Sequence, residues 1–209
     1  MKVLLINGSP HEKGCTYTAL SLIAGELKAQ GIETEILHVG GQPVGGCIGC
    51  GGCRGGNGCV FGGVVNEAIE KAKTADAFVF GSPVHYASAA GNMASFMDRL
   101  AYAGGKYLAY KPAAVCCSAR RAGTTSTLDQ LVKYPQFFHM PLVNGSYWAM
   151  VHGSNPEQVL QDAEGCAVMQ ELGRNMAWLL RCIEAGKAAG IDHPQNPPRP
   201  MTCLLYTSP

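Results

Sequence analysis

Charge is the scarcest property of this 209-residue chain. Only 15% of its residues are charged, and 16 basic residues against 15 acidic ones give a formal net charge of +1. Without a basic surplus, we expect neither a nucleic-acid-binding nor a membrane-surface protein. No apolar run approaches the roughly 20 residues that cross a bilayer. The apolar residues 3–6 end at Asn7-Gly8-Ser9-Pro10, too short a stretch for a signal peptide, so the expected location is cytoplasmic.

Glycine and cysteine, by contrast, are plentiful. The chain has 27 Gly and 10 Cys, and four of the cysteines fall within residues 47–59. In a cytoplasmic protein most thiols stay reduced. We therefore interpret them as metal ligands, small buried apolar residues or redox groups rather than as disulfides.

Short apolar runs alternate with longer amphipathic ones, which predicts a parallel sheet with helices on both faces. The expected fold is α/β, a flavodoxin-like, doubly wound, five-stranded parallel sheet in one domain, residues 1–194, with an irregular tail at 195–209. Residues 203–209 resemble nothing before them and carry no weight. The predicted strands are 3–6, 33–39, 76–81, 112–117 and an interrupted fifth at 140–151, and the predicted helices are 16–30, 64–74, 88–101, 124–133 and 156–187.

The segment 8–18 follows the first predicted strand and enters a helix. It has neither the Gly-Lys-Ser/Thr ending of a Walker A loop nor a G-x-G-x-x-G pattern. Hydroxyls at Ser9, Thr16 and Thr18, with free amides at the helix N-terminus, suit a phosphate dianion. The alternative is a helix merely capped near Thr16. A helix N-terminus also lowers a thiol pKa, which makes Cys15 a candidate reactive cysteine, against the alternative of a small residue that fits the loop.

Two further loops end at the same edge of the predicted sheet. Residues 82–88 place Tyr86 beside a proline turn, where it would face a planar ring, although loop tyrosines are also ordinary surface residues. Residues 118–124 again offer small residues, amides and cations. Because ligands bind at the carboxyl ends of parallel strands, the joint placement of these loops predicts a binding site.

The motifs Asn7-Gly8-Ser9-Pro10, Gly81-Ser82-Pro83-Val84-His85-Tyr86 and Met97-Asp98-Arg99 resemble those of the NADPH-dependent FMN reductase family of flavodoxin-like proteins. The resemblance covers residues 1–201 and implies non-covalent FMN and a homodimer or homotetramer. Cys15 stands where the family usually has Asn, and His11 where it often has Arg. The residues implied are Ser9, Cys15, Thr16 and Tyr17 for the phosphate, Pro83, Val84, His85 and Tyr86 for the isoalloxazine ring, and Ser118, Arg120 and Gly123 for its other edge.

The cysteine loop, residues 47–59, has the pattern C-x2-C-x2-C-x5-C. Cys47, Cys50, Cys53 and Cys59 supply the four thiolates that a [4Fe–4S] cluster takes, and the intervening glycines allow a tight fold around it. The spacing resembles that of the iron–sulfur flavoproteins, which carry such a cluster close to FMN. Free thiols, zinc and a disulfide stay open as alternatives. Gly62-Gly63 also stands where relatives commonly have two acidic residues.

The expected function is that of an FMN oxidoreductase that takes electrons from NAD(P)H and passes them to a small-molecule or protein acceptor. No catalytic side chain is predicted, because the flavin carries the chemistry. One alternative is an electron carrier whose cluster relays electrons between ferredoxin and FMN. Another is a binding module that has lost its cofactor. Asp98-Arg99 is expected to be a solvated pair or a subunit contact, and the small residues 87–105 to suit a subunit interface.

Overall fold

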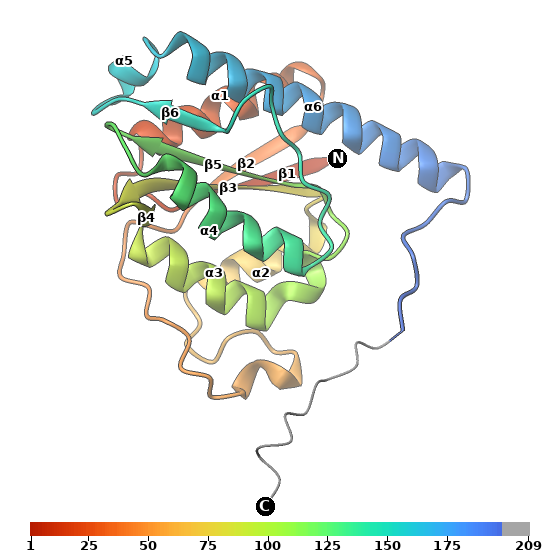
Figure 1. Ribbon diagram of the computed structural model, residues 1–209. Coiled ribbons are helices and arrows are strands. Elements are labelled where there is room, and N and C mark those ends of the chain that lie inside the picture. The colour runs from red at the N-terminus through yellow and green to blue at the C-terminus, as the bar shows by residue number, and fades with distance from the viewer. Residues whose placement is uncertain (198–209) are drawn as a thin grey trace, which may run out of the picture.

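The computed structural model describes residues 1–197, and they form a parallel sheet between two helical layers (Figure 1). The strand order β2-β1-β3-β5-β6 is that of a flavodoxin-like, doubly wound sheet. The strands are β1 (Lys2–Asn7), β2 (Glu33–His38), β3 (Ala77–His85), β4 (Ser88–Ala89), β5 (Ala113–Ala119) and β6 (Met150–His152). All sheet pairs are parallel except β4, which pairs antiparallel with the end of β3. The expected five parallel strands are confirmed, with β4 as a sixth strand.

Figure 1 shows α1, α5 and α6 on one face of the sheet, and α2, α3 and α4 on the other. The α-helices are α1 (Cys15–Ala29), α2 (Val64–Thr74), α3 (Gly91–Gly104), α4 (Thr124–Phe137), α5 (Pro156–Val159) and α6 (Ala163–Ala188), and short 3-10 helices lie at η1 (Gly52–Gly55) and η2 (Gly105–Tyr107). Within residues 1–197, no helix is both long and apolar enough to span a bilayer.

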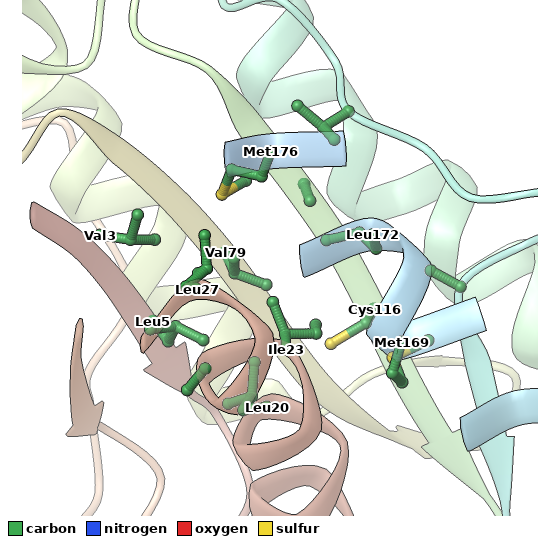
Figure 2. Close-up of a cluster of buried hydrophobic side chains, with 14 of the residues drawn as sticks. Val3, Leu5, Leu20, Ile23, Leu27, Val79, Cys116, Met169, Leu172 and Met176 are labelled. Carbon is green, nitrogen blue, oxygen red and sulfur yellow. The ribbon is translucent and has the colours of Figure 1, made fainter. Parts of the chain in front are cut away.

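The core lies between the sheet and α1 and α6 on one face (Figure 2). Val3 and Leu5 of β1 and Cys116 of β5 meet side chains from both helices there. Gly173 lets α6 approach α1 closely, since an added Cβ would lie 2.8 Å from the Ile23 carbonyl oxygen. A second cluster, which includes three buried phenylalanines, fills the other face. The sheet is therefore covered on both faces, and its rims are left for a ligand.

Several predicted boundaries are wrong. The helix predicted over 88–101 begins at Gly91, because Ser88–Ala89 pair antiparallel with the end of β3 as β4. The fifth strand predicted within 140–151 is regular only at Met150–His152, and Leu142 makes an isolated bridge to Ala113. Strand β3 does not halt at Ser82 but continues to His85, because Pro83 sits where the ladder ends and its missing N–H is not needed. The helix predicted over 156–187 is two helices, since the Asp162 carboxylate accepts from the Gly165 amide and caps a new helix there. Residues 195–197 have no regular structure, and the remainder of the expected tail lies outside the described residues.

Candidate flavin site and cysteine loop

The carboxyl ends of β1, β3 and β5 meet at one rim of the sheet. The Gly8 amide, directly after β1, donates to the Gly81 carbonyl oxygen of β3 at 2.9 Å. Pro83 of β3 stands opposite Ser118 of β5 in the parallel register. The three loops that the sequence placed at one edge are therefore neighbours.

The β1–α1 loop, residues 8–14, is shaped by polar contacts at its start. Buried Asn7 accepts from the Ser9 amide through Oδ1 at 3.1 Å and donates through Nδ2 to the Glu12 carbonyl at 2.9 Å. The Ser9 hydroxyl accepts from the His11 amide at 3.1 Å. A ring nitrogen of His38 lies 2.7 Å from the Ser9 carbonyl oxygen. Asn7 and His38 were not predicted as site residues; the Asn7-Gly8-Ser9 turn signal could have indicated the first, whereas nothing local points to the second.

Helix α1 begins without a side-chain cap. Its N-cap is Gly14, which makes no side-chain hydrogen bond, and the Thr18 amide makes the first helical bond, to the Gly14 carbonyl. The amides of Cys15, Thr16 and Tyr17 precede that bond and have no intrahelical partner. Such an uncapped N-terminus suits a phosphate group, because its amides and the helix dipole favour negative charge.

Thr16 connects this helix start to β5 rather than capping it. Its hydroxyl lies 2.8 Å from the Ser118 hydroxyl, and the two side chains are only 1% and 4% exposed. The capped-helix alternative near Thr16 is therefore wrong. Thr18 also turns its hydroxyl back onto the Gly14 carbonyl, at 3.2 Å, and away from a phosphate role.

The prediction of a lowered Cys15 pKa is wrong. Burial raises the pKa of this thiol; its own backbone N–H opposes that effect, and Glu157 adds to it. The Cys15 Sγ lies 3.5 Å from the Gly153 carbonyl, to which the neutral thiol donates. Cys15 therefore acts as a small packing residue that leaves its amide free.

The rim next to β3 carries a strained hairpin. Tyr86 and Ala87 form the turn between β3 and β4 with φ values of +50° and +59°, a conformation that Asn-Gly pairs adopt at much lower cost. Tyr86 is fully exposed, and Pro83 and Val84 are half-buried below it. Strain of this kind concentrates where a ligand or a catalytic group needs the backbone held in place.

Helix α4 holds the hairpin from behind. Gly123, at φ +92°, lies so close that an added Cβ would be 2.7 Å from the Ala87 Cα. The Ser126 hydroxyl donates to the Ala87 carbonyl at 2.7 Å, and Gln130 Oε1 accepts from the Ser88 hydroxyl at 2.7 Å. These contacts fix the hairpin against the loop that follows β5.

Basic groups stand open at the same rim. His85 at the end of β3 and Arg120 after β5 are both exposed. The positive charge of Arg120 and the free amides at the start of α1 give the rim an electrostatic field that favours an anionic ligand. The donor set and the uncapped helix thus fit the phosphate of FMN, and the hairpin offers a planar ring a flat neighbour.

The structure does not assemble the cysteine loop into a metal site. Within residues 1–197, no three His, Cys, Asp or Glu side chains gather as a metal-binding group. Cys47 and Cys50 are exposed, whereas the sulfurs of Cys53 and Cys59 turn toward α3. As a ligand set, four free thiols in a glycine-rich loop still fit iron or zinc chemically, although this conformation does not bring them together.

The expectation that Asp98-Arg99 is a solvated pair is wrong, whereas its alternative, a subunit contact, stays a prediction. Arg99 is only 7% exposed and donates through Nε to the Cys59 Sγ at 3.3 Å. Asp98 accepts from the Tyr134 hydroxyl at 2.7 Å. The two neighbours therefore serve different contacts, which their adjacency in sequence does not reveal.

Two cavities lie away from the rim. One of about 520 Å³ lies between α3 and α4 and is lined by Tyr102, Tyr134 and Phe137 among others. Another of about 1130 Å³ lies at the opposite end of the sheet, beside Tyr110 and Lys111. Neither contains the residues predicted to bind the cofactor.

The strand order β2-β1-β3-β5-β6, with helices on both faces, defines the class as flavodoxin-like α/β proteins. The family model of NADPH-dependent FMN reductases matches residues 1–155, and the chain belongs to this family of FMN-binding oxidoreductases. It is 28% identical over 192 residues to an iron-sulfur flavoprotein of Methanocaldococcus jannaschii, an alignment that covers 88% of this chain and all of that protein. An iron-sulfur flavoprotein of Archaeoglobus fulgidus is 36% identical over 99 residues, 47% of this chain and 48% of that one.

Solved structures show the same fold. RosB with bound 8-demethyl-8-formylriboflavin-5'-phosphate superposes with a TM-score of 0.68 at 14% identity, over 98% of this chain and 94% of RosB. The apo NADH:FMN oxidoreductase EmoB gives 0.63 at 18% identity, over 85% and 89%. At these identities the likeness establishes the flavodoxin-like architecture alone.

Proposed function

We propose that the protein is an FMN-dependent oxidoreductase that accepts electrons from NAD(P)H and passes them to a small-molecule or protein acceptor. The observation that carries this proposal is the rim, where an uncapped helix start, buried hydroxyls and a strained hairpin converge. Membership of the FMN reductase family supports it.

The protein's part is binding and orientation, while FMN supplies the hydride chemistry. The α1 amides and the Ser9 hydroxyl hold the phosphate, and the hairpin orients the ring. No side chain needs to act as a nucleophile or base. The proposed FMN-binding residues are Ser9, Cys15, Thr16 and Tyr17 for the phosphate, and Pro83, Val84, His85, Tyr86, Ser118, Arg120 and Gly123 for the ring.

A second candidate is an iron–sulfur flavoprotein that relays electrons between ferredoxin and FMN. The contact of Arg99 with Cys59 favours it, because a buried cation beside a sulfur suits a metal-bound thiolate. The relatives named iron-sulfur flavoproteins also support it. The proposed ligands are Cys47, Cys50, Cys53 and Cys59.

We also infer a homodimer or homotetramer in the cytoplasm. Exposed Tyr102 beside the cavity between α3 and α4 supports assembly through the small-residue segment 87–105. The cysteines of the described residues are all free, as suits a reducing compartment. Size-exclusion chromatography with light scattering tests the assembly; a monomer at every concentration contradicts it.

Visible spectra of anaerobically purified protein test the function. Flavin absorbance that bleaches on addition of NADPH or NADH, followed by reoxidation with a quinone, supports the oxidoreductase. Stoichiometric iron and sulfide with no bleaching by either nucleotide favours the carrier. A colourless protein that takes up no added FMN contradicts both.

Matched variants connect the result to the rim. Ser9→Ala removes a buried hydroxyl beside the proposed phosphate, and we expect FMN affinity to fall about tenfold or more, as for a lost hydrogen bond to a charged group. Ser21→Ala, within α1 and farther from the rim, is the control and leaves FMN affinity unchanged. If Ser9→Ala and Ser21→Ala bind FMN with equal affinity, Ser9 does not bind the phosphate.

A further inference from the structure

The cavity between α3 and α4 has the size and the walls of a small-molecule site. Its volume is about 520 Å³, within the range of roughly 300–1,000 Å³ that such sites span. Four aromatic side chains line it: Tyr102 of α3, Tyr134 and Phe137 of α4, and Phe138 directly after α4. Because these residues are separate from those proposed to bind FMN, the cavity is a candidate site for a second ligand.

The walls of the cavity follow from helical spacing. Helices α3 and α4 lie side by side on one face of the sheet (Figure 1). Asp98 and Tyr102 are four residues apart on α3, so they share a helix face. Tyr134 and Phe137 are three residues apart on α4 and share a face in the same way. The Phe137 and Phe138 rings meet edge to face, with their centroids 5.1 Å apart. Aromatic rings from both helices therefore surround one space.

Asp98 gives this space a negative charge. Its carboxylate is half-buried and accepts from the Tyr134 hydroxyl through Oδ1 at 2.7 Å. Burial, and next the Asp98 carboxylate, raise the pKa of Tyr134, so its hydroxyl stays protonated and keeps donating. The ion pairs found among residues 1–197 do not include Asp98. The carboxylate thus has no cationic partner there, and its second oxygen can accept from a ligand.

Two further polar side chains, Gln130 and Lys133, line the cavity. The Gln130 Oε1 already accepts from the Ser88 hydroxyl at 2.7 Å and from the Ala89 amide at 2.8 Å, so this oxygen is engaged with the hairpin. Lys133 is exposed, and water and salt screen its charge more than they screen a half-buried carboxylate. Asp98 therefore dominates the charge that a ligand meets inside the cavity.

This lining favours an organic cation over other ligands. Faces of Tyr and Phe rings attract cations, and more strongly once the cation has left water. A carboxylate adds a charge-assisted hydrogen bond to an N–H donor. One carboxylate supplies too few oxygen ligands for Ca²⁺ or Mg²⁺, and aromatic walls would be wasted on a metal ion. An ammonium group attached to an apolar body uses both features.

We propose that the cavity between α3 and α4 binds an aromatic primary ammonium ion, with the ammonium group at Asp98 and the ring among the aromatic side chains. The site is separate from the flavin rim, and the proposal does not depend on the oxidoreductase function. A second copy of the chain is the competing occupant, because assembly through residues 87–105 would cover the exposed Tyr102.

The test is isothermal titration calorimetry of the full-length protein with two probes of the same shape. Tyramine carries the ammonium group, and 4-propylphenol has a methyl group in its place. Asp98→Asn removes the charge but keeps an acceptor for Tyr134, and Lys133→Met removes the opposing cation. Asp129→Asn is the matched control, since Asp129 is an exposed carboxylate of α4 that does not line the cavity. Thermal unfolding verifies that each variant is folded.

We expect wild type to bind one tyramine per chain, about tenfold or more tightly than 4-propylphenol, as for a hydrogen bond to a charged group. Asp98→Asn should remove that preference, Lys133→Met should strengthen tyramine binding, and Asp129→Asn should bind both probes as wild type does. Equal tyramine affinity in wild type and Asp98→Asn, or no preference for tyramine in wild type, would overturn the proposal. Binding of neither probe would overturn it as well, and a dimer in light scattering of the same samples would then assign the cavity to a second copy.

Discussion

Replacing Thr16 by Val tests the connection between the start of α1 and β5. Thr16 and Ser118 share a hydrogen bond of 2.8 Å and are 1% and 4% exposed. Removing one hydroxyl leaves the other buried without its partner, which costs about 1–3 kcal/mol. Removing both leaves no orphaned group, so Thr16→Val/Ser118→Ala should be more stable than the sum of the single changes predicts, by about 1 kcal/mol or more.

The assay is urea unfolding of FMN-free protein, with stability taken from the midpoint at constant slope. Wild type, Thr16→Val, Ser118→Ala and the double variant complete the cycle. Single-variant effects that add within about 0.5 kcal/mol would refute the direct contact. Each single variant should also bind FMN more weakly, because the contact fixes the α1 amides relative to the ring site.

Three further predictions concern the hairpin and a buried thiol. Gly123→Ala should weaken FMN binding and destabilise the fold by about 1 kcal/mol or more, since its Cβ would meet Ala87; Gly31→Ala, at a similar φ of +76° in open space, is the control that loses stability but not FMN affinity. Tyr86→Asn/Ala87→Gly should relieve backbone strain and stabilise the fold by about 1–2 kcal/mol in thermal unfolding, yet weaken FMN binding. A double variant with unchanged stability and unchanged FMN affinity contradicts the strained-site argument. Burial raises the pKa of Cys117 from 9.0 to about 12, so the unfolded chain loses this proton first. The contribution of the neutral Cys117 thiol to the free energy of unfolding is therefore fully present below pH 9 and is lost as the pH rises toward 12. In urea unfolding, Cys117→Ala should lose less stability between pH 9 and 12 than wild type does.

Local pattern predicted the elements whose signals are local. The apolar run at residues 3–6 and the helix at 64–74 match β1 and α2, because buried strands and amphipathic helices differ in period. The sequence also predicted that the loops after β1, β3 and β5 lie together, since parallel strands place their carboxyl ends at one edge of the sheet. The end of β3 was predicted wrongly at Ser82-Pro83, because a Pro ordinarily marks a turn. Whether a strand can contain a Pro depends on its pairing with the neighbouring strand, which the sequence does not show.

Tertiary contacts decided what the sequence could not. Arg99 looks like a surface residue until α3 packs against the segments that flank the cysteine loop. Cys15 looks activated by its helix, yet burial beside Gly153 outweighs that effect. The side chains that shape the β1–α1 loop, Asn7 and His38, likewise depend on contacts between separate elements.

A flavin fluorescence titration of the FMN-free protein tests the central claim most directly. FMN and riboflavin differ only in the phosphate, which the amides of α1 and Ser9 are proposed to hold. Several charge-assisted hydrogen bonds should make FMN bind about a hundredfold more tightly than riboflavin, at one FMN per chain. Equal affinities for the two flavins, or no binding of either, would contradict the account.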